Sequence, residues 1–199
     1  NQMKLLKEWS PFALFIIVML LLRVYVWQPV IVEGHSMDPT LADKERLVII
    51  KTARIKRQDI VVAKEYNKED QSTKNIVKRV IGMPGDTISY NNDVLTVNGK
   101  VIAEPYLTNY QKQLATDKLQ QTYQFNSFFQ SLGKNAKSFT MSATGQTDFT
   151  VKVPEGQYFL MGDNRLVSQD SRQVGTFSKK DIIGEAKLRI WPFKKIGLL

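Results

Sequence analysis

The sequence contains no cysteine and a single histidine, His35. Without cysteine the chain cannot form a disulfide, a thiolate zinc site, an iron–sulfur cluster or a thiol nucleophile. With one histidine it also cannot form the two-histidine zinc motif of a helix. No acidic ladder of the EF-hand type is present, although scattered carboxylates leave magnesium or calcium binding open. We therefore expect no metal site and no cofactor.

Acidic residues are few, 19 against 28 lysines and arginines, which gives a net charge of +9. Such an excess fits binding to nucleic acid or attraction to anionic lipid headgroups. The basic residues are spread along the chain and are not gathered in one recognition helix. We therefore expect the lipid bilayer as a partner, and no nucleic acid.

Charge is absent from one stretch, Trp9 to Leu22, and only Arg23 interrupts the apolar pattern before Trp27. The 19 residues from Trp9 to Trp27 approach the roughly 20 that a membrane-spanning helix needs. Tryptophans at both ends suit the two membrane interfaces, and Arg23 can extend toward the headgroups. The pattern predicts one membrane-spanning helix over residues 9–28.

Lysines before the apolar stretch indicate its orientation. Lys4 and Lys7 favour a short cytoplasmic N-terminus over residues 1–8, which places residues 29–199 outside the cell membrane. One alternative is a cleaved secretory signal, but residues 24–29 are bulky where small residues should precede the cut. The other is a buried core helix, which Pro11 and Arg23 keep open.

Beyond Pro29 the sequence is dominated by short apolar runs separated by turn residues. Asn98-Gly99 is a strong signal for a two-residue hairpin. Many short strands with turns between them predict a mainly β domain. The expected strands are 46–51, 59–64, 76–81, 87–90, 94–97, 100–102, 150–153, 158–161 and 185–193.

Residues 106–149 differ from the rest because they are rich in Gln, Lys, Ser, Thr and Asn, and their apolar residues have no clean period. We interpret this segment as an insertion into the β domain. It forms either a small lobe on the β core or a long mobile surface excursion.

Ser36, in Gly34-His35-Ser36-Met37-Asp38-Pro39, is a candidate nucleophile, and a serine hydroxyl needs a base to take its proton. Side chains of adjacent residues usually point apart, so His35 is a poor base for Ser36. A buried lysine of lowered pKa can serve instead, as in the serine-lysine proteases. Lys78 in Lys78-Arg79-Val80-Ile81-Gly82 is the candidate.

Three stretches together resemble the type I signal peptidases, membrane-bound Ser-Lys proteases that remove signal peptides from exported proteins. They are Ser36-Met37-x-Pro39-Thr40, then Lys78-Arg79-Val80-Ile81-Gly82-x-Pro84-Gly85-Asp86, then Gly162-Asp163-Asn164-Arg165-x-x-Ser168-x-Asp170-Ser171-Arg172. They occur in the family's order behind an apolar anchor, and the single span resembles the Gram-positive branch. The resemblance implies a signal-peptidase-like catalytic β domain.

The resemblance also implies roles for these residues. Ser36 attacks the scissile carbonyl, and Lys78 takes its proton and later activates water. Ser168 hydrogen-bonds the lysine, Asp170 and Arg172 pair to brace their loop, and Met37 shapes the turn that carries the nucleophile.

The Ser36 main-chain N–H is the expected oxyanion donor. Some family members supply a second donor from a serine at the position of Gly34, so that donor is unassigned here. The implied substrates are preprotein signal peptides with small residues at positions −1 and −3, bound as an added strand along 30–34 and 76–78. Val32 and Val77 are the expected pocket residues, with a plain core role as the alternative.

Three other interpretations remain. A LexA-like Ser-Lys autoprotease would carry a DNA-binding module where this chain has its apolar stretch. A non-catalytic signal-peptidase-like assembly factor at the cell surface should lack Ser36 or Lys78. A basic nucleic-acid-binding domain would leave the three motifs unexplained. The sequence predicts neither an oligomeric state nor a dedicated substrate.

Overall fold

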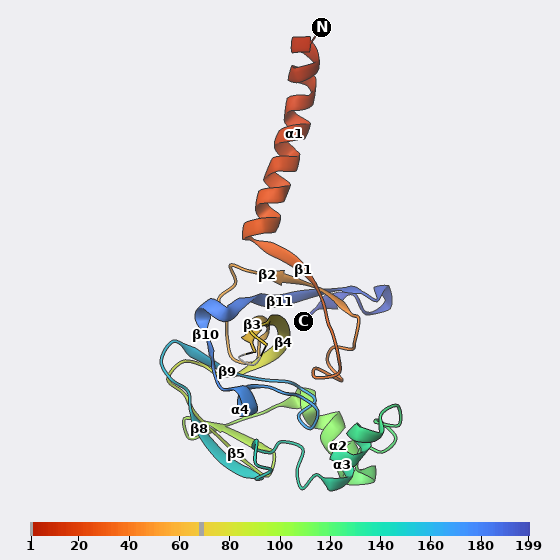
Figure 1. The fold of residues 1–199 in the computed structure, drawn as a ribbon, viewed down its shortest axis with the longest axis vertical. Helices are drawn as coiled ribbons and strands as arrows, with labels where there is room; N and C mark the ends of the chain where they lie inside the picture. The colour runs from red at the N-terminus through yellow and green to blue at the C-terminus, as the bar shows by residue number, and fades with distance from the viewer. Residues whose placement is uncertain (1, 68–69) are drawn as a thin grey trace.

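The computed structural model describes residues 2–67 and 70–199, with side chains from Glu8 onward. Helix α1 (Gln2–Tyr25) projects from the body of the molecule as a single rod (Figure 1). Its apolar stretch, Glu8–Tyr25, is long enough to cross a membrane, and none of it is buried. The alternative of a buried core helix is therefore wrong.

The helix ends earlier than expected. Strand β1 (Trp27–Ile31) pairs antiparallel with β2 (Arg46–Ile50), so the last predicted span residues, 27 and 28, already belong to the sheet. Pro29 disfavours helical backbone at the residue before it. Lys51 completes the junction, because its Nζ donates to the Val24 carbonyl and its main-chain N–H to that of Val26, each at 2.8 Å.

The body contains two antiparallel sheets, which confirms the mainly β fold. The larger sheet has the order β1-β2-β11-β3-β4-β9-β10, with β12 beside β11. Its further strands are β3 (Ile60–Tyr66), β4 (Thr73–Gly82), β9 (Gln157–Met161), β10 (Phe177–Ser178), β11 (Ile182–Trp191) and β12 (Gly197–Leu198). The turns η2 (Lys179–Asp181) and η3 (Phe193–Lys195) precede and follow β11, so the last predicted strand ends at Trp191 and not at residue 193.

The smaller sheet has the order β7-β6-β5-β8. Its strands are β5 (Thr87–Asn91), β6 (Val94–Val97), β7 (Lys100–Ile102) and β8 (Asp148–Lys152). Asn98 and Gly99 form the expected hairpin turn, with positive φ angles of 50° and 80°. Buried side chains of both sheets, including Ile81, Ile88 and Phe159, pack together and join them.

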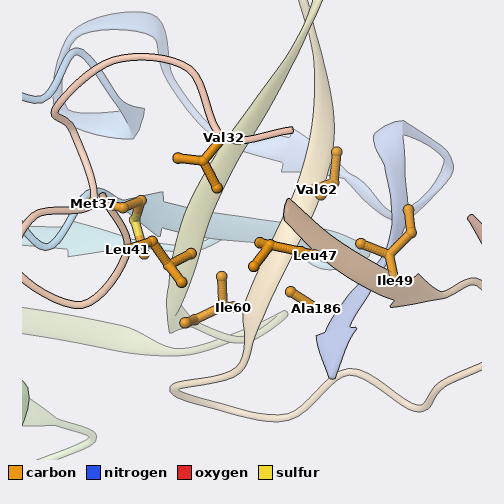
Figure 2. Packing of buried hydrophobic residues seen from close by; sticks show 8 residues of the cluster. All are labelled: Val32, Met37, Leu41, Leu47, Ile49, Ile60, Val62 and Ala186. Carbon is orange, nitrogen blue, oxygen red and sulfur yellow. The ribbon is translucent and has the colours of Figure 1, made fainter. Parts of the chain in front are cut away.

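A hydrophobic cluster in the larger sheet lies directly behind the loop that follows β1 (Figure 2). Alternate residues of β2 and β3 point to the same side of the sheet and meet residues of that loop. The cluster comprises Val32, Met37, Leu41, Leu47, Ile49, Ile60, Val62 and Ala186. It fixes the loop on both sides of Ser36.

Residues 106–149 form a small lobe with its own core, as the first of the two alternatives for this insertion predicts. The lobe contains η1 (Pro105–Leu107), α2 (Thr108–Asp117) and α3 (Ser127–Asn135), and lies at the end of the molecule away from α1 (Figure 1). The two helices were not predicted, because both are short and polar. The buried core of the lobe consists of Leu107, Tyr110, Leu114, Leu119, Tyr123, Ala136 and Phe139.

Candidate active site

Ser36 lies in the turn between β1 and β2, held from behind by the hydrophobic cluster. Met37 is 1% exposed, so its side chain anchors the residue directly after Ser36 in the core. The main-chain N–H of Leu41 donates to the Met37 carbonyl at 3.0 Å and closes the turn. The placement agrees with the turn-shaping role expected for Met37.

Lys78 reaches Ser36 from β4. Its Nζ donates to the Ser36 Oγ at 2.8 Å, although the two residues are 42 positions apart in the chain. Only 4% of Lys78 is exposed. The structure therefore brings together the two residues that the motifs single out.

Burial changes the acid–base chemistry of Lys78. Removal from water disfavours the ammonium form and lowers the Lys78 pKa from 10.5 to about 8, against the opposing influence of Asp170 and Glu65. A neutral amine is consequently present at mildly alkaline pH. An amine in that form can accept the proton of a hydroxyl that lies within hydrogen-bonding distance.

His35 is directed away from this pair. Its Nδ1 lies 2.9 Å from the Asp38 carboxylate, and its ring packs against Phe125 and Phe129 at centroid distances of 4.8 and 5.8 Å. The neighbouring imidazole is therefore engaged elsewhere, as the alternation of adjacent side chains predicts.

Asp170 and Arg172 form the expected pair in the loop after β9. The Nε and Nη2 of Arg172 donate to the two carboxylate oxygens of Asp170, each at 2.8 Å. Asp170 also accepts from the Gly162 main-chain N–H at 3.0 Å and caps the short helix α4 (Ser171–Val174). Burial alone would raise the Asp170 pKa, but the Arg172 guanidinium, with hydrogen bonds from Gly162 and Ser168, holds that pKa below its ordinary value.

Ser168 lies in the same loop as Asp170, but its hydroxyl does not make the hydrogen bond to Lys78 that the resemblance implies. It is 4% exposed, and its hydroxyl faces the Gln169 carbonyl at 3.5 Å. Within residues 2–67 and 70–199, the hydrogen bond seen for the Lys78 amine goes to Ser36 and not to Ser168.

Asp163 and Asn164 belong to the third motif but received no role from the sequence. The Asp163 carboxylate accepts from the Thr40 hydroxyl at 2.5 Å. The main-chain N–H of Asn164 donates to the Ser36 carbonyl at 3.0 Å. Both are fully buried. Their position beside Gly162 in a dense polar motif was the signal that could have pointed to them.

A cleft of about 640 Å³ opens beside the pair, between β1 and β4. In the described part of the chain, residues 73–78 of β4 pair only with β3, because pairing with β9 begins at Arg79. Similarly, β1 pairs only with β2 there. The cleft is lined by Gln28, Pro29, Val30, Ile31, Glu33, Ser36, Glu65, Lys74, Asn75, Ile76, Val77, Lys78 and Gln169.

Of the two expected pocket residues, Val77 lies in the cleft and Val32 lies in the core. Val77 lines the cleft. Val32 is 2% exposed and packs in the hydrophobic cluster behind the Ser36 turn, which corresponds to the core role given as its alternative. Val30 and Ile31 line the cleft from β1 instead.

The main-chain amides near Ser36 differ in their availability. No residue among those described accepts a hydrogen bond from the Ser36 N–H, so this donor is available. The Gly34 N–H donates to the Asp43 carboxylate at 2.8 Å, and Gly34 has a φ of 82° that favours glycine. Gly34 therefore shapes the turn, and its own amide is already used.

Comparisons with known proteins identify the family of the chain. The family described as signal peptidase, peptidase S26, matches residues 6–191. Signal peptidase I of Streptococcus pneumoniae serotype 4 is 52% identical over 96% of this chain and 96% of that protein. Signal peptidase I of Bacillus licheniformis is 40% identical over 98% and 94%. A crystal structure of a signal peptidase I from Enterococcus faecalis, 27% identical, aligns with 67% of this chain and 97% of that one at a TM-score of 0.48. The chain therefore belongs to the signal peptidase family, peptidase S26, as its three motifs predict.

Proposed function

We propose that this protein is a membrane-bound serine endopeptidase that removes signal peptides from exported preproteins with a Ser36–Lys78 pair. The observation that carries the proposal is the 2.8 Å hydrogen bond from the Lys78 amine, whose pKa is lowered by burial, to the Ser36 hydroxyl. A serine and a neutral lysine in this geometry are the minimum for nucleophilic catalysis without histidine.

In the acylation step the neutral Lys78 amine takes the Ser36 proton while Oγ attacks the scissile carbonyl. The Ser36 N–H donates to the oxyanion that forms. The Lys78 ammonium then protonates the departing amine, and the signal peptide stays bound to Oγ as an ester.

In the deacylation step neutral Lys78 removes a proton from water, which attacks the ester. The Lys78 ammonium then returns that proton to the departing Ser36 Oγ, and the signal peptide leaves with a free carboxyl group. Ser168 and the Asp170–Arg172 pair hold the loop that borders the lysine. We assign Ser168 the role of orienting the amine through Asp170, to which its hydroxyl hydrogen-bonds, because a displaced lysine would lose its alignment with Oγ.

The cleft suits an extended peptide. The free edges of β1 and β4 offer main-chain groups to an added strand. Val77 and Val30 narrow the space next to Ser36 and would exclude bulky side chains, which accounts for a preference for small residues at −1 and −3.

Helix α1 would anchor the protein with the body on the extracytoplasmic side. The lining of the cleft begins at Gln28, three residues after α1 ends, so the cleft opens close to the membrane surface. A signal peptide whose apolar segment lies in the bilayer could therefore reach Ser36 without leaving it.

The test is cleavage of a membrane-presented preprotein with an Ala-x-Ala site by the unmodified protein, Ser36→Ala and Lys78→Ala. We expect cleavage at that site, and its loss in both variants although each remains folded. If the unmodified protein binds the preprotein and never cuts it, the assembly-factor alternative takes over. If the protein cuts only its own chain and not the preprotein, the LexA-like autoprotease alternative is favoured.

A further inference from the structure

One residue holds the main chain on both sides of the Ser36 Cα. The main-chain N–H of Asn164 donates to the Ser36 carbonyl, and its side-chain Nδ2 donates to the His35 carbonyl, both at 3.0 Å. Asn164 is fully buried. The peptide groups before and after Ser36 are thus fixed by the same side chain and backbone.

The orientation of that Asn164 amide depends on the inserted lobe. The Tyr123 hydroxyl, on a residue that is 1% exposed, donates to the Asn164 Oδ1. An amide can rotate so that its oxygen and nitrogen exchange places, and the hydrogen-bond partners decide which arrangement holds. With Oδ1 turned to Tyr123, Nδ2 faces the His35 carbonyl. The opposite arrangement would place two oxygens against each other there.

The lobe holds Tyr123 firmly and contacts the same turn a second time. The Tyr123 ring packs edge-on against Tyr110 and Phe129, with centroid distances of 6.1 and 5.6 Å. Phe129 and Phe125 also pack on the His35 ring, one residue before Ser36. The lobe therefore reaches the nucleophile turn in two ways, indirectly through the Tyr123–Asn164 hydrogen bond and directly through ring contacts with His35.

We propose that Tyr123 is a positioning residue for the nucleophile, acting through Asn164, so that the inserted lobe is a working part of the active site. The inference rests on the proposed role of Ser36 as nucleophile. Removing the Tyr123 hydroxyl leaves the buried Asn164 Oδ1 without its donor and frees the amide to rotate. The Ser36 main chain then loses a fixed partner, and displacements of about 1 Å at a reacting group can cost up to a hundredfold in rate.

The test compares Tyr123→Phe with Tyr110→Phe, which removes a hydroxyl from the neighbouring ring in the same lobe core. For cleavage of an Ala-x-Ala peptide we expect Tyr123→Phe to lower kcat about tenfold, with KM and the pH profile unchanged, since cleft and Lys78 keep their contacts. Tyr110→Phe should stay within twofold of the unmodified protein. The rate at which a small organophosphate labels Ser36 should fall with kcat.

A second variant, Asn164→Asp, keeps the shape but replaces the donor facing the His35 carbonyl by an acceptor, and should lower kcat further than Tyr123→Phe. The kcat values are expressed per labelled active site. Equal values for Tyr123→Phe and Tyr110→Phe would overturn the proposal. A parallel loss of kcat and a rise in KM would reduce Tyr123 to a general structural role and overturn it too. If no peptide is cut but Ser36 labelling slows in Tyr123→Phe, the substrate assignment fails while the positioning role stands.

Discussion

The guanidinium of Arg79 forms a bidentate ion pair with the fully buried carboxylate of Asp163, through hydrogen bonds of 2.8 and 2.6 Å. The same carboxylate accepts from Thr40 in the nucleophile turn. Because Arg79 follows Lys78 on β4, Asp163 connects the strand of the proposed base to the turn of the proposed nucleophile. The relative placement of Ser36 and Lys78 thus depends on a carboxylate whose hydrogen bonds, among the described residues, go to Thr40 and Arg79.

Replacing Asp163 by Asn should therefore destabilise the protein strongly. The substitution leaves the Arg79 charge, on a residue only 8% exposed, without its counter-ion, which typically costs about 3–5 kcal/mol. Urea denaturation would measure the free energy of unfolding. Asp148→Asn, at an exposed carboxylate of β8, is the matched control and should change it by less than about 0.5 kcal/mol. A loss below 1 kcal/mol for Asp163→Asn would contradict the structural role of the pair.

The pH dependence of cleavage should follow the neutral fraction of Lys78. With a Lys78 pKa of about 8, kcat/KM should level off above pH 9 and fall roughly tenfold for each pH unit below 8. Initial rates on a peptide with no titrating side chain would give this profile. A rate that stays flat from pH 6 to pH 9 would speak against lysine as the base.

Lys78→Met should abolish cleavage and stabilise the fold. Burial that lowers the Lys78 pKa from 10.5 to about 8 corresponds to a cost of about 3 kcal/mol for the charged amine in the folded state. Below pH 8 the amine is protonated in the folded and the unfolded protein, so the cost of burying the charge is fully present. The free energy of unfolding should therefore increase most on substitution by methionine in this pH range. Between pH 8 and 10.5 the folded lysine becomes neutral first, and the advantage should shrink.

Denaturation of Lys78→Met and the unmodified protein at pH 7 and pH 10 would measure this difference. Lys64→Met, at an exposed lysine of the neighbouring strand β3, serves as the control. An advantage of methionine that is absent at pH 7, or that grows toward pH 10, would show that Lys78 is not held at a cost in the folded state.

The sequence singled out Ser36 and Lys78, which the structure places in contact, and it predicted most strands, because both depend on local patterns. Apolar runs between turns marked the strands, and the motifs marked Ser36 and Lys78. The helices of the lobe were missed because they are only 10 and 9 residues long and contain few apolar residues. The contact of Tyr123 with Asn164 joins residues 41 positions apart through side-chain atoms, and no sequence pattern encodes it. Val32 was predicted to line the cleft because it belongs to the segment expected to bind the peptide. Its side chain instead packs in the hydrophobic cluster.

Gly162 should not tolerate a side chain. A Cβ at this position would fall against the Ser36 carbonyl oxygen and the Ser168 hydroxyl, well inside van der Waals contact. The first of these is main chain, so the nucleophile turn itself would have to move. We expect Gly162→Ala to lower kcat at least a hundredfold. Gly197→Ala, where a Cβ meets nothing within 4 Å, should be silent. Activity of Gly162→Ala within threefold of Gly197→Ala would contradict the close approach.

Removing residues 1–25 should separate membrane attachment from catalysis. No part of the Glu8–Tyr25 stretch is buried against the body, so its loss exposes no core, and β1 starts only at Trp27. The shortened protein should stay folded and cut a soluble Ala-x-Ala peptide with kcat/KM within a few-fold of the full chain. It should no longer float with lipid vesicles, and it should cut a vesicle-inserted preprotein at least tenfold more slowly, because the effective concentration of enzyme and substrate on one surface is lost. Flotation and paired cleavage assays would measure both. Equal cleavage of the inserted preprotein by the two forms would show that α1 contributes nothing to substrate capture, and loss of soluble-peptide cleavage would show that the body needs the helix to hold Ser36 in place.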